Sequence, residues 1–382
     1  MSKPGAKPDM SNIEPTTVTD IGRMAGCSIA TVSRVLNNSG AVSAKKRAAI
    51  LKAIQDTQFY TSRARRGGRR TGNKKEAGGV VEIIQHRHSP IEKLSVQKGQ
   101  LNVGPLVHAT KDSEYGNAFT FYRNIVDGVI EELARWGYRA QMRMNSNLLD
   151  PALLADINNP DRTGVLLIGE YSNDLHEFVK HCHHPLVLVD LIGKGMPDVV
   201  TTDNYQGITE AFTHLYNLGH RKIGYVGQSF YMPTLPDERY TAYKLNMTER
   251  GLAIREDWIY NGADHIEETA AAVTKILNLE DRPSALMCAN DCYALGVVRA
   301  ASAVGISIPE QLSVVGFDDS DFASMITPPL TTVRVPVQEM GRQGVRQLMI
   351  SLKGGTMPSK SRGCHVRLLP ELIVRESTAA VK

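Results

Sequence analysis

The sequence predicts an α/β body of two lobes, each a parallel sheet with helices on both faces, behind an N-terminal all-α head of the helix-turn-helix type. Two patterns support this prediction. Short helical patterns fill the first part of the chain, and apolar runs alternate with helical patterns after residue 80. Because 382 residues exceed one ordinary domain, two or three units are expected.

The head begins with two short helical patterns joined by a glycine. Residues 20–25 place Ile21, Met24 and Ala25 at the spacing that buries one stripe of a helix. Gly26 allows a left-handed turn at no steric cost. The second helix can therefore begin within three residues of the end of the first.

The second helix, residues 29–36, follows Ser28, whose hydroxyl is suited to an N-cap. We expect one side of it to be buried, through Val32, Val35 and Leu36. The other side carries Ile29, Ala30, Ser33 and Arg34. This side is predicted to be free to read DNA.

A third helix begins after Ser43, with Ile50 and Ile54 facing inward. Three short helices make the minimal bundle that holds a recognition helix.

The charge of the chain is unevenly distributed. Residues 1–78 hold 15 Lys and Arg against 5 Asp and Glu, whereas the remaining residues hold 29 against 35. Seven of the thirteen residues 63–75 are Lys or Arg. A basic head on an acidic body predicts a polyanionic partner for the head alone, and the basic segment is expected to contact phosphates.

Several other classes of protein fit the sequence poorly. No run of 18 apolar residues and no apolar signal core occur, so we expect a cytoplasmic protein with no membrane partner, and not a solute-binding protein for uptake. Neither GxGxxG nor GxxxxGK[ST] is present, which disfavours a dehydrogenase or kinase. Five scattered cysteines do not suggest disulfides. We expect no enzymatic activity, no cofactor and no metal site.

The body is predicted from buried strands alternating with helices. The apolar runs are residues 80–84, 164–169, 185–190, 222–227, 284–290 and 312–319, and the helical patterns are residues 124–136, 206–218, 238–250, 267–278 and 293–304. Runs rich in Val, Ile and Leu suit parallel strands buried on both faces. The number of units is too large for one compact sheet, so two similar lobes are expected.

Ligands of such folds bind beyond the carboxyl ends of the strands. Polar residues stand there at Asp190, Asn290, Asp291, Asp318 and Asp319, and Arg239 opens the helix after another strand. Paired carboxylate and guanidinium groups suit vicinal hydroxyls or a carboxylate. We expect Arg239 and Asp318 to contact a ligand and Asp291 to cap its helix.

Five separated motifs resemble the lactose repressor and galactose repressor family of bacterial transcription regulators, over residues 17–377. They are TVSRVLN (31–37), LGHRKIGYVG (218–227), RPSALMCANDCYALGVVRA (282–300), the run at 308–336 containing SVVGFDDSDFASMITPPLTTVRVP, and PELIVRES (370–377). The resemblance implies a homodimer that reads double-stranded operator DNA, with a two-lobed, periplasmic-binding-protein-like body that holds a small effector.

The resemblance also implies a division of the chain. The head spans residues 17–62, a basic hinge 63–78 and the body 79–382. The first lobe would hold residues 79–202 and 333–363, and the second 203–332 and 364–377, with crossings near Thr202, Thr332 and Cys364.

Two sets of site residues follow from the family pattern. The DNA-binding set is Thr19, Ser28, Ile29, Ala30, Thr31, Ser33, Arg34, Asn37, Arg63, Arg65, Arg66 and Arg69. The effector set is Phe121, Tyr122, Asp190, Arg239, Asn290 and Asp318. The expected function is a sequence-specific regulator, a repressor, controlled by a small polar effector such as a sugar. The alternative is a constitutive DNA-binding regulator with a vestigial effector site.

The chain departs from the family at two places. Relatives have a hinge helix with a leucine that enters the minor groove, whereas residues 65–70 here read RRGGRR. Residues 85–117, with His86, His88 and Tyr115, form a longer connection that is either a lid or a surface excursion. Leu235 stands where relatives often have a polar contact, so the effector is not readable from relatives.

Overall fold

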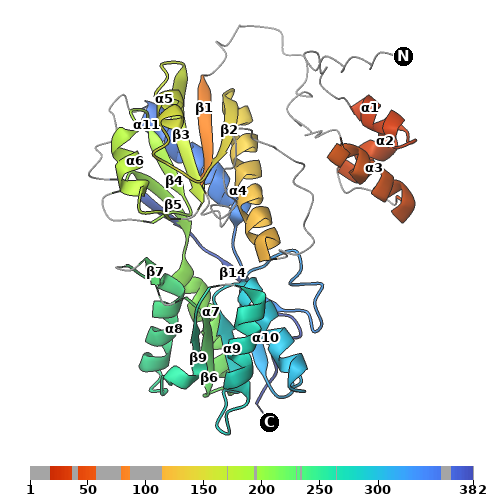
Figure 1. Cartoon of the computed structure of the whole chain (residues 1–382), viewed down its shortest axis with the longest axis vertical. Helices are drawn as coiled ribbons and strands as arrows, with labels where there is room; N and C mark the ends of the chain where they lie inside the picture. Colours follow the sequence, from red (N-terminus) through yellow and green to blue (C-terminus); the bar gives the residue numbers. More distant parts are fainter. Residues whose placement is uncertain are drawn as a thin grey trace, which may run out of the picture. The chain divides into compact units, whose positions relative to one another are not determined.

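The computed structural model describes residues 18–36, 42–56, 79–86, 114–169, 171–192, 196–228, 230–232, 235–263, 265–353 and 363–381. The chain divides into two compact units, Met1–Lys74 and Lys75–Lys382. Figure 1 labels the helices of the first unit α1 to α3 and the elements of the second from β1 onward.

The head consists of α1 (Val18–Met24), α2 (Ile29–Leu36) and α3 (Ala44–Asp56). Its core is formed by Ile21, Val32, Val35, Ile50 and Ala53. Gly26 has a φ of 60°, as expected for the left-handed turn between α1 and α2.

The prediction that Met24 is buried was wrong, because its side chain is 54% exposed. Met24 ends a seven-residue helix. The core of three short helices covers the middle of α1, at Ile21, and does not reach its last residue.

The first lobe contains a six-stranded parallel sheet in the order β13-β5-β4-β3-β1-β2. The strands are β1 (Val80–His86), β2 (Arg139–Asn145), β3 (Arg162–Gly169), β4 (Leu186–Val189), β5 (Asp198–Thr202) and β13 (His365–Leu368). Val81 and Ile83 belong to one buried cluster with side chains of α4 (Glu114–Trp136) and α11 (Val337–Lys353). Ile84 belongs to another, with side chains of α5 (Pro151–Ile157) and α6 (Leu175–His181). Helices therefore cover both faces, as predicted.

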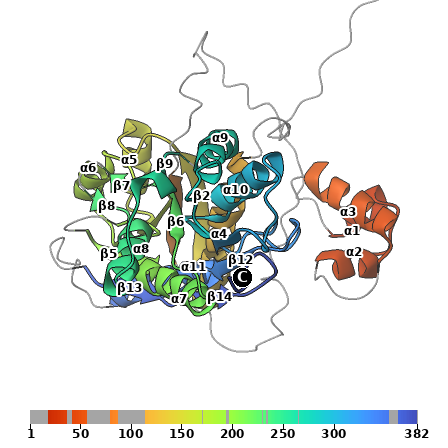
Figure 2. The ribbon, with the colours of Figure 1, turned by 90° about the horizontal axis from the view of Figure 1, so that it is seen from below.

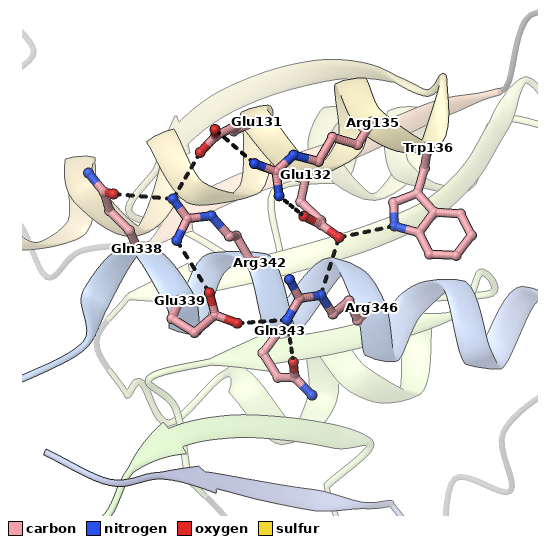
Figure 3. Close-up of polar contacts among 9 residues, drawn as sticks. All are labelled: Glu131, Glu132, Arg135, Trp136, Gln338, Glu339, Arg342, Gln343 and Arg346. Carbon is pink, nitrogen blue, oxygen red and sulfur yellow. Dashed lines mark hydrogen bonds and ion pairs between the residues drawn. The ribbon is translucent and has the colours of Figure 1, made fainter.

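The helices α4 and α11 are held together tightly along their length. A Cβ on Gly341 would lie 2.0 Å from the backbone oxygen of Ile125, so the two backbones touch at this point. Further along, carboxylates and guanidinium groups of both helices form a network that Figure 3 shows; its ion-pairing members are Glu131, Glu132, Arg135, Glu339, Arg342 and Arg346. Close packing and ion pairs thus make one unit of the two helices.

The second lobe contains a sheet in the order β14-β12-β11-β10-β6-β9. The strands are β6 (Ile223–Gly227), β9 (Ile259–Asn261), β10 (Ala285–Cys288), β11 (Ser313–Asp318), β12 (Thr331–Arg334) and β14 (Glu371–Ile373). The helices are α7 (Asn204–Asn217), α8 (Glu238–Glu249), α9 (Ile266–Leu277) and α10 (Asp291–Ala303), with a short 3-10 helix at Glu256–Trp258 and a hairpin of β7 (Phe230–Met232) and β8 (Leu235–Pro236). In Figure 2, α9 and α10 lie on one side of β6, and α7 and α8 on the other. This sheet departs from the all-parallel expectation, since β14 runs antiparallel to β12.

The chain passes between the lobes three times: after β5, after β12 and after β13. Thr332 lies inside β12, so the second crossing comes after Arg334. The third crossing was expected at Cys364 but follows Leu368, because residues 365–368 pair with β5 and remain in the first sheet. The chain passes from the end of β13 directly into β14, and Glu371 at the start of β14 pairs with Arg334 at the end of β12, so the two strands run antiparallel.

The long connection after the first strand is partly regular structure. His86 is the last residue of β1, and its buried ring hydrogen-bonds the backbone oxygen of Asn145 at 2.9 Å. Tyr115 already belongs to α4. Residues 87–113, including His88, lie outside the described residues. Within the described part of the chain, every helix is too short or too polar to cross a membrane.

Candidate functional site

The N-terminus of α2 is capped as the sequence predicts. The hydroxyl of Ser28 accepts a hydrogen bond from the backbone N–H of Thr31 at 3.2 Å and lies 2.9 Å from the Thr31 hydroxyl. This cap satisfies one of the backbone donors that a helix leaves unpaired at its start. It also holds the Thr31 side chain at the first turn of the helix.

The two sides of α2 differ in burial. Val32 and Val35 lie in the core of the head, whereas Ile29 is 53% exposed and Arg34 is exposed. Residues 29 and 33, and likewise 30 and 34, are four apart and lie on the same side of the helix. The exposed side combines an apolar group with a guanidinium, which is a composition suited to reading base edges in a major groove.

The remaining residues of the expected DNA-binding set are less fully described. Thr19 lies in α1, and Ala30 and Ser33 lie in α2. Asn37, Arg63, Arg65, Arg66 and Arg69 fall outside the described residues.

A cavity of about 180 Å³ lies between the two lobes. It is lined by Thr120, Phe121 and Asn124 of α4, by Asp318, Asp319, Ser320 and Asp321, and by Arg334, Val335 and Val337. The cavity therefore joins the second and third turns of α4 to the carboxyl ends of β11 and β12, where the fold predicts a ligand.

Arg239, in the first turn of α8, is held by four contacts. Its Nε donates to the side-chain oxygen of Asn204 at 2.9 Å, and a terminal nitrogen donates to the backbone oxygen of Ala289 at 2.5 Å. The other terminal nitrogen lies 3.6 Å from the Asp318 carboxylate, and the guanidinium lies 4.0 Å from the centre of the Phe317 ring. The guanidinium is thus fixed in position and orientation.

The charge of Arg239 is maintained by its neighbours. Burial acts to lower the pKa of the guanidinium, but the carboxylates of Asp318, Asp237 and Asp190 outweigh this effect and raise the pKa above its ordinary value. Asp190 follows β4 of the first lobe, whereas Arg239 and Asp318 belong to the second. The structure therefore brings these three predicted residues into one electrostatic group.

Three aspartates at strand ends have left-handed backbone conformations. The φ angles are 63° for Asp190, 107° for Asp318 and 53° for Asp319. Such conformations cost roughly 1–3 kcal/mol for residues other than glycine, and they cluster at binding sites.

Asn290 and Asp291 both stand at the start of α10. Asn290 caps α10 by accepting a hydrogen bond from the backbone of Tyr293 at 3.0 Å. Asp291 is fully buried inside the first turn and accepts hydrogen bonds from Ser320, at 2.7 and 2.8 Å, and from the Thr332 hydroxyl at 2.6 Å. The cap prediction for Asp291 was wrong, because α10 begins two residues earlier than its pattern suggests. Burial raises the pKa of Asp291 to about 6.

The two residues of α4 in the expected effector set, Phe121 and Tyr122, differ in their surroundings. Phe121 lines the cavity, whereas Tyr122 is buried in the core of the lobe, with the ring centres 5.3 Å apart. Neighbouring residues of a helix point in directions about 100° apart, so both side chains do not face one cavity. This arrangement does not support the expected contact of Tyr122 with an effector.

Sequence reasoning missed several residues at this cavity. Thr120 and Asn124 lie within one turn of Phe121, and Ser320 and Asp321 follow the aspartate pair that was singled out. Arg334 ends β12. The rule that ligands bind beyond the ends of parallel strands would have indicated Arg334, had β12 been recognised.

The described residues include no group of three or more His, Cys, Asp or Glu side chains arranged to hold a metal ion. Cys288 and Cys292 are buried and unbridged.

Two family models match the chain. "Bacterial regulatory proteins, lacI family" matches residues 17–62, and "Periplasmic binding protein-like domain" matches residues 212–378. The HTH-type transcriptional repressor PurR of Haemophilus influenzae (strain PittEE) is 28% identical over 373 residues, which cover 96% of this chain and 99% of the relative. The NTD biosynthesis operon regulator NtdR of Bacillus subtilis (strain 168) is 27% identical over 368 residues, covering 95% and 99%.

Solved structures show the same fold. The complex of the transcriptional regulator CelR with cellobiose has a TM-score of 0.62 at 24% identity and covers 95% of this chain and 99% of that chain. The lac repressor dimer bound to operator and the anti-inducer ONPF has a TM-score of 0.61 at 20% identity and covers 96% and 100%. The head thus matches the lacI family of bacterial regulatory proteins, the body matches a periplasmic-binding-protein-like domain, and the named repressor and regulator relatives align with the chain over almost their whole length.

Proposed function

We propose that this protein is a sequence-specific DNA-binding transcription regulator, a repressor, whose operator affinity is controlled by a small polar effector bound between its lobes. The observation that carries this proposal is the presence, in one chain, of a capped recognition helix with an exposed reading side and of a polar cavity at the ends of parallel strands. The relatives named above are repressors and operon regulators, in agreement with this function.

Recognition of bases is assigned to the exposed side of α2. Ile29, which is half exposed, suits contact with a thymine methyl group, as would Ala30. Arg34 suits paired hydrogen bonds to O6 and N7 of guanine. The basic residues Arg63, Arg65, Arg66 and Arg69 would add phosphate contacts, which strengthen binding without specifying sequence.

The effector is assigned to neutral polyhydroxylated compounds, such as a sugar or sugar derivative. Asp318, Asp319 and Asp321 line the cavity together with Arg334. Asp318 also faces Arg239 at 3.6 Å, and Asp319 also pairs with Arg375 at 2.5 Å. Arg334 is also engaged with Asp319 at 2.7 Å. Carboxylates accept hydrogen bonds from the hydroxyl groups of such compounds. Two solved relatives hold sugars, cellobiose in CelR and ribose in a regulator from Enterococcus faecium, which supports this class.

The protein is proposed to act as a homodimer in the cytoplasm, where operator DNA is found. The lac repressor structure is a dimer on its operator, and two heads related by a two-fold axis would read a near-palindromic site. This assembly is a proposal for the present chain.

Two linked experiments test the proposal. Selection of bound sites from random DNA with the full-length protein should yield one near-palindromic sequence. A thermal-shift screen of neutral sugars and their phosphates should then find a compound that raises the melting temperature and changes operator affinity. Recovery of no operator would contradict the DNA-binding function, and an operator without any effective ligand would favour a constitutive regulator.

A further inference from the structure

A chain of polar contacts connects the first lobe to the guanidinium of Arg239. Its first member is Arg367, on the edge strand β13 of the first sheet. A terminal nitrogen of Arg367 donates to Oε1 of Glu238 at 2.8 Å, although Glu238 belongs to α8 of the second lobe. This ion pair bridges the two lobes at the level of their crossings.

Glu238 also hydrogen-bonds Asn204. Its other carboxylate oxygen, Oε2, accepts a hydrogen bond from the side-chain nitrogen of Asn204 at 3.0 Å. The Asn204 side-chain oxygen in turn accepts from Nε of Arg239 at 2.9 Å. The Asn204 side chain therefore donates through its nitrogen and accepts through its oxygen, so its orientation is set by Glu238 and Arg239 together.

The segments that carry this chain are coupled at the backbone. Leu368, the last residue of β13, accepts a hydrogen bond from the backbone N–H of Asp203 at 2.8 Å. Asp203 caps α7, of which Asn204 is the first residue. The first and third crossings are thus joined directly beside the polar contacts, and a change in the angle between the lobes acts on Arg367, Glu238 and Asn204 at once.

The side chains are partly shielded from solvent. The exposed fractions are 36% for Arg367 and 20% for Glu238, and 19% for Arg239. Partial shielding reduces the screening of the charges. Glu238 also lies in the first turn of α8, where a negative charge is favoured by the helix dipole.

We propose that Arg367 and Glu238 form an inter-lobe latch that positions Arg239 through Asn204 and so couples the angle between the lobes to the effector site. This inference rests on the proposed function, because it assigns regulation to the same cleft. Opening or closing of the lobes breaks or forms the ion pair, and the Asn204 amide transmits the change to the guanidinium that faces Asp318. Arg367 and Glu238 do not line the cavity and act as positioning residues.

The test uses the full-length protein without added effector. Glu238→Gln retains a side chain that can bond Asn204 but lacks the charge that holds Arg367, and Arg367→Gln removes the partner charge. Each variant should change operator affinity by about fivefold or more, in the same direction. The double variant should show no larger change than the stronger single variant, because both act through one contact.

Arg255→Gln is the matched control. Arg255 is 37% exposed and pairs with Asp257 at 2.5 Å inside the second lobe, away from the crossings. Arg255→Gln should leave operator affinity unchanged. Arg367→Lys keeps the positive charge and should retain most of the wild-type operator affinity. Melting temperatures measured in parallel identify any variant that fails to fold. If Arg367→Gln is such a variant, the operator affinity of Arg367→Lys still tests whether the positive charge is what matters at this position.

Amide hydrogen exchange of residues 203–207 and 238–241 provides a readout without DNA. Exchange should become faster in both single variants and stay unchanged in Arg255→Gln. The latch is overturned if exchange at these residues stays at the wild-type rate, or if the effects of the two single variants on operator affinity are additive. Failure to select any operator would contradict the proposed function instead, while the exchange measurement still decides the latch.

Discussion

Two tyrosines in the core of the second lobe should respond oppositely to loss of their hydroxyl groups. Tyr225 and Tyr243 are both fully buried, and their ring centres lie 5.2 Å apart. The Tyr225 hydroxyl has no hydrogen-bond partner among the described residues, whereas the Tyr243 hydroxyl donates to the backbone oxygen of Ile223 at 2.9 Å. The same substitution, Tyr to Phe, therefore removes an unpaired polar group at one position and a hydrogen bond at the other.

The magnitudes follow from the cost of burying polar groups. An unpaired buried hydroxyl costs about 1–3 kcal/mol, so Tyr225→Phe should stabilise the protein by up to that amount. A satisfied hydrogen bond contributes about 0.5–1.5 kcal/mol, so Tyr243→Phe should destabilise it by that amount. In a body of this size, about 1 kcal/mol corresponds to a shift of roughly 2–4 °C in melting temperature.

Urea unfolding of the full-length variants, followed by tryptophan fluorescence, measures both changes. Trp258 is buried in the second lobe and Trp136 lies at the end of α4 in the first, so the emission reports unfolding of both lobes. The two midpoints should move in opposite directions from that of the wild type. If Tyr225→Phe destabilised the protein as much as Tyr243→Phe, the assignment of an unpaired hydroxyl would be refuted.

Three further changes have defined outcomes. Arg34→Ala should cost about 1–3 kcal/mol at one base position of the selected operator, measured by fluorescence anisotropy; equal weakening on all sequences would identify a phosphate contact instead. The buried Asp291 has its pKa raised from 3.8 to about 6 by burial, so the folded state binds the proton more tightly than the unfolded state. The resulting contribution to the free energy of unfolding should be complete below pH 3.8 and should be lost as the pH rises through about 6. Relative to Asp291→Asn, the loss measured by urea unfolding should be about 3 kcal/mol. Parallel pH profiles of the two proteins would contradict this. Gly341→Ala should destabilise the first lobe by about 1–3 kcal/mol in the same assay, because the new methyl group would meet the backbone oxygen of Ile125; an unchanged midpoint would show that the α4 and α11 pair can separate.

Local patterns predicted the elements whose side chains are buried on a regular period. The recognition helix, its Ser28 cap and the turn at Gly26 are encoded within a few neighbouring residues, and the structure reproduces each of them. The central strands β3, β4 and β6 are continuous apolar runs buried on both faces, so they were visible in the sequence. The resemblance to a family of transcription regulators was recognised from five separated motifs that occur in the order typical of that family.

Edge strands were not visible in the same way. β2 and β13 alternate between exposed and half-buried residues, and they pair with only one neighbour each. They contain no apolar run, and their partners are far away in the sequence. The third crossing, which the family resemblance placed near Cys364, follows Leu368 because residues 365–368 form such an edge strand.

The sequence by itself determined which kinds of residue reach the cleft, because Asp190, Asp318 and Arg239 each stand at the end of a strand or the start of a helix. Only the tertiary structure decided how they are used. Whether Phe121 or Tyr122 faces the cavity depends on the rotation of α4 against its sheet, and whether Asn290 or Asp291 caps α10 depends on where that helix begins. These choices are set by packing between segments remote in the chain, which no local pattern records.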